Sequence, residues 1–423
     1  MSARDDACTI LKTLRDAGFE AFLAGGCVRD ELLGLTPKDY DVATAATPDE
    51  VESLFRGTRA VGKAFGVVLV RLGDEVIEVA TFREEGAYSD KRRPDEVRFS
   101  DAEHDAGRRD FTVNALFLDP LAPRETWSEG AAGRVIDYVG GQADLDSRIL
   151  RAVGEASERL AEDHLRALRA VRFSARYGLA IEPATARAVR ADASELAGVS
   201  RERIGDEIRR MLLHSTRGTA LATLESLGLA ASMLGSPAIV PLHFDMVTGA
   251  AAAIESCDDE ARAIGLSLCA WMLDRTGMRS VEDVDGARRD LVRVCRRVLC
   301  LSNEETDAMR DVFTRLVEIE QEWGEAGVAR RKRMASSSCF TEAHALVHVR
   351  DSAIAAAVDS DLKTLRSTSS GLAPEPLVTG DDLIAAGFAP GPKFKQILDA
   401  VYDAQLEDRV RTADEAMDFV RGL

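Results

Sequence analysis

The sequence has 423 residues, enough for two to four domains with buried cores of their own. Its formal net charge of −18 argues against a protein that binds nucleic acid over most of its surface, because phosphate contacts need Lys or Arg. It does not exclude one confined basic surface. The seven cysteines show no CxxC spacing, and no apolar run is typical of a signal peptide or a membrane span, so we expect a cytoplasmic protein with reduced thiols.

The first 120 residues alternate between helical and strand patterns. The run AFLAGG at 21–26 predicts a strand that ends in a turn, and VRDELLG at 28–34 predicts a helix that Gly34 stops. DYDVAT at 39–44 alternates as a strand does, and two β-branched runs flank the hairpin signal Gly73-Asp74. The segment TVNALFLD at 112–119 fits either a strand or a helix. From about residue 144 the pattern is almost entirely helical, with two last helical segments after residue 380.

The glycine pair at the end of the first strand is a candidate phosphate-binding turn. Glycine lets the backbone approach a phosphate, and a following helix N-terminus offers free N–H groups. Gly25 and Gly26 alone would be no more than an ordinary turn. Arg29, one helical turn further on, adds a side chain that can donate two hydrogen bonds to a phosphate.

Asp39 and Asp41 are the candidate metal ligands. Side chains at i and i+2 of a strand point the same way, so the two carboxylates would lie side by side. Such a pair is tolerated when it is solvated or when a cation bridges it. An isolated pair would be an ordinary solvated strand, but this one follows a Gly-Gly-x-x-Arg turn by about ten residues, and that conjunction favours a metal site.

Five ordered motifs then resemble one known family. LAGGCVRDELLGLTPKDYDVAT resembles the signature of the class II tRNA nucleotidyltransferase and bacterial poly(A) polymerase family, within the polymerase-β-like superfamily. It is followed by VGKAFGVV at 61–68, a loop motif at 82–99, GRRDFTVNALF at 107–117 and AEDHLRALRAVRFSARYGL at 161–179. The tail after residue 380 is also similar.

The resemblance implies an α+β fold, with a mixed-sheet nucleotidyltransferase head followed by an all-helical neck, body and tail. We expect the boundaries at 1–143 for the catalytic head, 144–235 for the neck, 236–365 for the body and 366–423 for an RNA-binding tail.

The implied chemistry is nucleotidyl transfer, in which an RNA 3′-hydroxyl attacks the α-phosphate of an NTP and pyrophosphate leaves. Two divalent ions suit this step, and Mg²⁺ favours the carboxylate oxygens of Asp39 and Asp41. Glu78 is a possible third acid, though an exposed strand glutamate is equally consistent with the pattern. Arg109 would clamp the triphosphate, and Asp110 or Asn114 could read the ribose hydroxyl.

The resemblance implies that the helix expected from Glu162 selects the nucleobase. Asp163, Arg166 and Arg169 are spaced three apart and would be neighbours along it. An Asp–Arg pair can match the hydrogen-bonding edge of cytosine or adenine and mismatch guanine and uracil, although most such pairs are surface salt bridges. The family assigns the arginine at the position of Arg172 to the nucleotide as well.

The predicted activity is therefore addition of C and A to the 3′ end of tRNA from CTP and ATP. VGKAFGVV favours this branch over poly(A) polymerase, but A-only addition, poly(A) addition and a non-catalytic RNA-binding relative stay open, as does the oligomeric state. No histidine reads as a metal ligand. The RNA-binding candidates are the basic runs 288–298 and 329–333 and the tail lysines, although such runs are more often solvated helix faces. Within them we expect contacts from the following side chains: Arg330, Arg331, Lys332, Arg333, Lys393 and Lys395.

Overall fold

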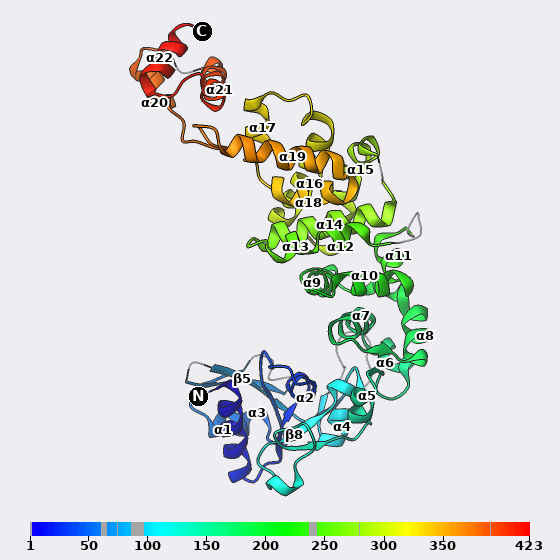
Figure 1. The fold of residues 1–423 in the computed structure, drawn as a ribbon. Coiled ribbons are helices and arrows are strands. Elements are labelled where there is room, and N and C mark those ends of the chain that lie inside the picture. Colours follow the sequence, from blue (N-terminus) through cyan, green and yellow to red (C-terminus); the bar gives the residue numbers. More distant parts are fainter. Residues whose placement is uncertain are drawn as a thin grey trace. The chain divides into compact units, whose positions relative to one another are not determined.

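The computed structural model describes residues 2–60, 66–73, 75–85, 97–236, 243–278, 280–389 and 391–423. The chain divides into two compact units, the first made of Met1–Ser200 with Thr223–Met233 and the second of Arg201–Ala222 with Leu234–Leu423 (Figure 1). Among the described residues no helix combines the length and the apolar character needed to cross a membrane.

The head contains the mixed sheet that the sequence predicts. Its strands run in the spatial order β3-β4-β5-β2-β1-β8-β9. They span Ala21–Ala24 (β1), Asp41–Thr44 (β2), Thr58–Ala60 (β3), Val67–Leu72 (β4), Glu75–Thr81 (β5), Phe117–Asp119 (β8) and Arg134–Ile136 (β9), and a separate ribbon joins Arg83–Glu85 (β6) to Val97–Phe99 (β7). β2 and β5 pair in parallel, whereas the other pairs of the large sheet are antiparallel.

Helices and 3₁₀ turns precede, separate and follow the strands of this sheet along the chain. They are α1 (Ala3–Asp16), α2 (Gly26–Leu32), α3 (Pro48–Leu54), α4 (Ala102–Gly107) and α5 (Gly141–Asp146), with 3₁₀ turns at Thr112–Asn114 (η2) and Arg124–Thr126 (η3). The ambiguous segment 112–119 is thus a 3₁₀ turn followed by a strand. Rings of Phe22, Phe82 and Phe117 meet at centroid distances of 5.9–6.2 Å and form the centre of the head core.

The next elements are mainly helical, but the helix expected over 162–179 is broken. The elements are β10 (Ile149–Leu150), α6 (Ala156–Glu162), α7 (Leu165–Tyr177), β11 (Ala180–Ile181), α8 (Pro183–Asp192), η4 (Ala193–Gly198), α9 (Arg201–Leu212), α10 (Arg217–Ser226) and α11 (Leu229–Leu234). Asp163 has an extended backbone (φ −151°, ψ 102°), and His164 beside it is buried with its Nδ1 2.7 Å from Asp192 Oδ1. This tertiary contact outweighs the local helical pattern.

The body is a stack of helices around an apolar centre. They are α12 (Asp245–Gly249), α13 (Ala251–Glu255), α14 (Glu260–Thr276), α15 (Val281–Leu299), α16 (Asn303–Glu322), α17 (Val328–Ala335), α18 (Phe340–Arg350) and α19 (Ser352–Arg366). α14 is buried on nearly every side and packs against α16 and α18. At Gly265 a Cβ would lie 2.8 Å from the backbone nitrogen of Met309, so glycine is what lets α14 and α16 approach so closely.

The tail has a small core of its own. Its described residues form three helices rather than the two expected: α20 (Gly380–Ala385), α21 (Pro392–Leu406) and α22 (Ala413–Arg421). Leu383, Val401, Ala404 and Val420 are buried among them. The boundaries of the four expected domains stay a prediction, because the division into two units does not test them.

Candidate active site in the head

The glycine turn lies at the end of β1. Gly25 adopts φ +74°, in the left-handed region that favours glycine, and α2 begins at Gly26. A Cβ on Gly25 would lie 2.8 Å from Nη1 of Arg109, so this guanidinium sits directly against the backbone of the turn. The turn is therefore shaped to hold a positive charge close to the strand ends.

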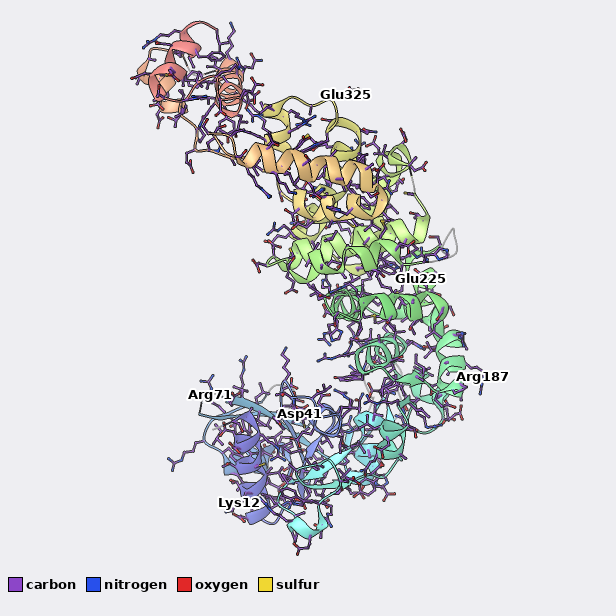
Figure 2. The ribbon with its side chains drawn as sticks, in the orientation of Figure 1. Lys12, Asp41, Arg71, Arg187, Glu225 and Glu325 are labelled. Carbon is purple, nitrogen blue, oxygen red and sulfur yellow. The ribbon has the colours of Figure 1, made fainter. Side chains whose placement is uncertain are left out.

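Carboxylates gather on the neighbouring strands. Val42 of β2 pairs with Val79 of β5 in parallel register, which places Asp41 beside Glu78 on the same face of the sheet. Asp41 is the first residue of β2 (Figure 2), whereas Asp39 lies two residues before the strand begins. The expectation that both aspartates lie within one strand is therefore wrong for Asp39, although the two remain neighbours electrostatically.

Each of these carboxylates makes ionisation of its neighbours less favourable. Burial, then Glu78 and Asp39, raise the pKa of Asp41 to about 7, while Arg109 opposes the shift. Partial burial and Asp39 raise the pKa of Glu78 as well. Of the residues that the structure describes, Asp39, Asp41 and Glu78 do not bring three ligand oxygens within 4.8 Å of one another. The donor set fits a hard divalent cation, whose charge would relieve this repulsion.

Arg109 is the positive charge that acts on Asp41. Its Nε and Nη2 lie 3.2 and 3.0 Å from Asp105 Oδ2, and its Nη1 donates to the backbone oxygen of Asn114 at 3.0 Å. Burial would raise the pKa of Asp105, but Arg109 and Arg108 hold it below its usual value. Asp105 thus fixes the guanidinium beside the glycine turn. The i,i+4 spacing of Asp105 and Arg109 was a signal for this pair that the sequence analysis missed.

Arg29 lies in a buried polar network rather than on an open surface. Its Nη2 donates to Asp30 Oδ1 at 2.7 Å and to the hydroxyl of Tyr177 at 2.5 Å, and its Nη1 donates to Asn114 Oδ1. Its guanidinium also lies 4.0 Å from the ring centroid of Tyr177. These contacts join α2, η2 and α7, so they support a positioning role, and phosphate binding by Arg29 stays a prediction.

Asp110 is the second centre of this network. Its Oδ1 accepts from the backbone of Phe111 at 2.8 Å and from Asn114 Nδ2 at 3.0 Å, while Arg169 reaches its Oδ2. Burial would raise the pKa of Asp110, but Arg169 and Asn114 lower it to about 2. Asp110 and Asn114 therefore hold each other and α7 in place, next to where the sequence predicts ribose recognition.

The remaining base-selecting candidates are placed differently from the expectation. Asp163 lies outside α7 and its Oδ1 accepts from the backbone of Leu165 at 3.1 Å. Arg166 is buried and donates to the carboxylate of Glu162 and to the backbone oxygen of Arg159. Arg172 is buried with its guanidinium 4.3 Å from the ring centroid of Phe173. Asp163 and Arg166 are therefore not successive members of one helical row, and their roles in base choice stay predictions.

Two of the family motifs fall partly outside the described residues. These are VGKAFGVV, of which residues 61–65 are not described, and the loop motif at 82–99, of which residues 86–96 are not described.

The expected RNA-binding charges are mostly engaged within the second unit. Lys332 is fully buried and donates to Thr368, Ser370 and the backbone oxygen of Leu406 at 2.6–2.8 Å. The expectation that Lys332 contacts RNA is therefore wrong. Its neighbours pair with acids: Arg330 with Glu322, Arg331 with Asp361 and Arg333 with Asp403. Lys393 and Lys395 are exposed.

A more open basic surface lies along the other basic run. A hollow of about 450 Å³ is formed by α15 and α16, and its lining residues are Arg288, Arg289, Val292, Arg293, Arg296, Thr306, Arg310 and Thr314. Arg293 has 77 % of its side chain exposed and pairs with Asp290 at 3.0 Å, an ion pair that solvent weakens. We call this surface the α15–α16 groove.

Comparison with known proteins identifies the family. The family described as "Poly A polymerase head domain" matches residues 21–151, and the one described as "Probable RNA and SrmB- binding site of polymerase A" matches residues 178–240. A CCA-adding enzyme of Lactiplantibacillus plantarum is 32 % identical over 422 residues, which is 97 % of this chain and 94 % of that protein. A CCA-adding enzyme of Bacillus subtilis is 42 % identical over 219 residues, so the chain spans about half the length (52 %) of that relative.

Solved structures agree in fold. The Bacillus stearothermophilus CCA-adding enzyme in complex with CTP has a TM-score of 0.73 and 28 % identity, covering 100 % of this chain and 98 % of its own. The Thermotoga maritima CCA-adding enzyme complexed with tRNA has a TM-score of 0.68 at 18 % identity, covering 99 % and 94 %, which is a likeness of fold. The polymerase-β-like head with a helical remainder is thereby confirmed, and identity over nearly the full length of both chains shows that this chain belongs to the family of CCA-adding tRNA nucleotidyltransferases.

Proposed function

We propose that the chain adds C and A to the 3′ end of tRNA from CTP and ATP and releases pyrophosphate. The observation that carries the proposal is the position of Asp41, in register with Glu78 and opposite Arg109, which combines repelling carboxylates with a fixed positive charge. Acids can hold the cations of nucleotidyl transfer, and an arginine can bind the triphosphate.

The metal would be Mg²⁺, held by Asp39 and Asp41, with Glu78 as a possible third ligand. When bound, such an ion would activate the attacking 3′-hydroxyl as a nucleophile and would neutralise charge on the leaving pyrophosphate. The raised pKa of Asp41 supports this reading, because a carboxyl that burial and like charges keep from ionising gains most from a nearby cation. Arg109, fixed by Asp105, would bind the triphosphate from the side of the glycine turn.

Choice of base would come from Asp163, just before α7, and from Arg166 in the first turn of α7. Asp163 can accept from the exocyclic amine of cytosine or adenine, and Arg166 can donate to the adjacent ring nitrogen. GTP and UTP would leave these groups unpaired, at a cost of about 1–3 kcal/mol for each buried group. Glu162 supports this proposal by holding Arg166 in one position, and Arg169 is held in the same way by Asp110.

The tRNA would contact the second unit through the α15–α16 groove. A local cluster of arginines on an acidic protein is what phosphate binding requires.

The seven cysteines are all unpaired, which fits a reducing compartment such as the cytoplasm.

Poly(A) addition and A-only addition use the same chemistry, and the names of the relatives favour CCA addition over both. A non-catalytic RNA-binding role would not need the repelling carboxylates at Asp41.

The test is an incubation of tRNA that lacks its 3′-terminal CCA with each NTP singly and with CTP and ATP together. We expect CTP alone to add two residues, and CTP with ATP to complete CCA and stop. Long A tails on unstructured RNA would overturn the tRNA assignment, and extension only of tRNA that already ends in CC would show an A-adding enzyme.

A further inference from the structure

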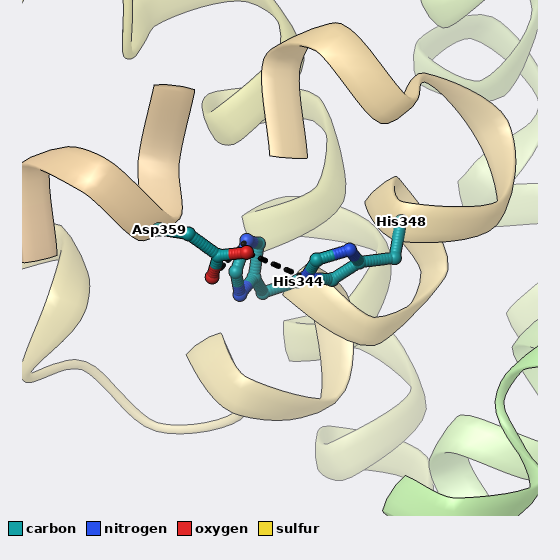
Figure 3. Close-up of side chains that lie close together, drawn as sticks. All are labelled: His344, His348 and Asp359. Carbon is teal, nitrogen blue, oxygen red and sulfur yellow. Dashed lines mark ion pairs between the residues drawn. The ribbon is translucent and has the colours of Figure 1, made fainter. Parts of the chain in front are cut away.

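Two histidines and an aspartate converge in the body, far along the chain from the catalytic head. His344 and His348 are one turn apart on α18, so their rings lie on the same helix face. Asp359 projects from the next helix, α19 (Figure 3), with its carboxylate oxygens 3.7 Å from His344 Nε2 and 3.3 Å from His348 Nε2. One ligand atom from each residue lies within 4.8 Å of the other two.

The two helices are fixed relative to each other. Asp351 caps α19 by accepting from the backbone of Ala353 and Ile354 at 2.9 and 3.0 Å. Leu346 and Val358, one from each helix, are fully buried in the body. The spacing of the three polar side chains is therefore set by apolar packing.

His344 is the member of this cluster that most needs a partner. Its ring is nearly buried, stacks on Phe340 with a centroid distance of 5.8 Å, and its Nε2 has no hydrogen-bond partner among the described residues. The 3.7 Å separation from Asp359 is too long for a hydrogen bond. A buried polar atom left unpaired is unfavourable, so a histidine–aspartate hydrogen bond does not account for the arrangement.

The protonation of His344 also suits metal binding. Burial and the neighbouring His348 lower the pKa of His344, although Asp359 and the backbone of Ala355 act in the opposite direction. A neutral imidazole keeps a lone pair on one ring nitrogen, which is the form that coordinates metals.

We propose that His344, His348 and Asp359 form a binding site for one divalent transition-metal ion of the Zn²⁺ type. Two imidazole nitrogens and one carboxylate oxygen are a ligand set that Zn²⁺ accepts, with a fourth position left to water. Mg²⁺ and Ca²⁺ prefer sites made only of oxygen, so this site differs in chemistry from the carboxylates of the head. About half of the side-chain surface of His348 and of Asp359 is exposed, which gives an ion a path of entry. The bound ion links α18 to α19 and stabilises the body.

The test uses the full chain, stripped with a chelator and kept in excess Mg²⁺ so that the oxygen-only carboxylates of the head are occupied. Zn²⁺ is then titrated calorimetrically into the wild type and into the His348→Ala and Asp359→Asn variants. We expect one Zn²⁺ per wild-type chain and at least about tenfold weaker binding in each variant, because removing a ligand should have a larger effect than removing a residue that only supports one. Both substituted side chains are half-exposed, and circular dichroism verifies that the variants fold.

The matched control is His243→Ala, since His243 is an exposed histidine outside the cluster. It should leave Zn²⁺ affinity unchanged. Co²⁺ as a probe separates this site from binding by cysteine such as the exposed Cys300, because nitrogen and oxygen ligands give visible absorption bands without the near-ultraviolet band of a thiolate. Undiminished binding in the His348→Ala/Asp359→Asn double variant, a thiolate band, or no Zn²⁺ bound to the wild type would each overturn the proposal.

Discussion

Arg169 approaches Asp110 with two nitrogens, Nε at 2.7 Å and Nη2 at 2.6 Å, both from the same oxygen, Oδ2. This ion pair joins α7 to the segment before η2. The other oxygen of Asp110 is bound by Phe111 and Asn114, so the carboxylate is fully engaged in the first unit. The pair connects two of the family motifs, the one at 107–117 and the one at 161–179.

Asp110→Asn should destabilise the protein evenly across neutral pH. The pKa of Asp110 is lowered to about 2 from an ordinary 3.8, so its ionised form stabilises the folded state by about 2 kcal/mol above pH 4, and this contribution is lost as the pH falls from about 4 to about 2. Urea unfolding of wild type and variant at pH 6 and pH 8 measures the difference. We expect the same reduction in stability at both values, and an equally stable variant would contradict the pKa assignment.

Asp39→Ala and Asp41→Ala should each lower the rate of nucleotide incorporation by at least about 10³-fold. The reason is that loss of a metal ligand removes the cation on which nucleotidyl transfer depends. Labelled CTP with tRNA lacking CCA provides the assay, and binding of tRNA to the same variants serves as the control because it should not change. Near-normal incorporation by either variant would rule out its metal role.

Asp41→Asn should make the metal-free protein more stable at high pH. Because the pKa of Asp41 is raised to about 7, its charge destabilises the folded state, and this penalty grows from about pH 4 and is complete above about pH 7. The shift from 3.8 sets an upper bound of about 4 kcal/mol for the gain at pH 8. Thermal unfolding in chelator at pH 5 and pH 8 would show it. Mg²⁺ should stabilise the wild type more than the variant, and a variant less stable than wild type at pH 8 would refute the argument.

Asp163→Ala and Arg166→Ala should reduce the preference for CTP and ATP over UTP and GTP. Each replacement removes part of the proposed base-reading edge, so we expect a loss of selectivity of about 10- to 100-fold, corresponding to about 1.4–2.8 kcal/mol. Relative kcat/KM for the four NTPs is the measurement. Glu162→Gln tests the supporting contact separately: it keeps the guanidinium of Arg166 but removes the charge that holds it, so we expect a smaller loss of selectivity than in Arg166→Ala. If selectivity is unchanged in both alanine variants, Asp163 and Arg166 have only a structural role.

The sequence predicted the head more completely than the site. Period-two and helical patterns predicted β1, α2, β2 and the β4–β5 hairpin, because local preference and tertiary packing agree there. The break at Asp163 was not predictable, since it depends on His164 reaching Asp192 in another helix. The same holds for Lys332, whose position in a charged run predicts exposure although three oxygens from distant segments surround its Nζ.

The metal cluster in the body illustrates the same limit. The spacing of His344 and His348 is visible in the sequence and places two rings on one face, yet that pattern alone is common in surface helices. Asp359 joins them only through the packing of α18 on α19, which no periodicity in one helix specifies. Local sequence patterns therefore predicted the motifs. The residues that contact those motifs could be identified only from the folded structure.

The last prediction concerns the RNA-binding surface. Arg289→Glu and Arg293→Glu, in the α15–α16 groove, should weaken tRNA binding, because each reversal removes a positive charge that neutralises a phosphate and adds repulsion. The slope of log affinity against log salt should become shallower by about one for each phosphate that the variant no longer neutralises. The Michaelis constant for CTP should change little, since the nucleotide residues belong to the first unit.

The matched control for the groove is Arg330→Glu, because two carboxylates, those of Glu318 and Glu322, hold Arg330, whereas Arg293 pairs with one exposed carboxylate, that of Asp290. Arg330 should therefore contribute less to binding. Lys393→Glu tests one of the two exposed tail lysines separately. Lys332 is unsuitable for this experiment, since reversing a fully buried charge would disturb the packing of Thr368 and Ser370 and so confuse loss of fold with loss of binding. Filter binding of tRNA across a salt series decides between the surfaces. If Arg330→Glu or Lys393→Glu weakens binding and the groove variants do not, the RNA path follows the basic run at 329–333 or the tail, and the groove assignment is wrong.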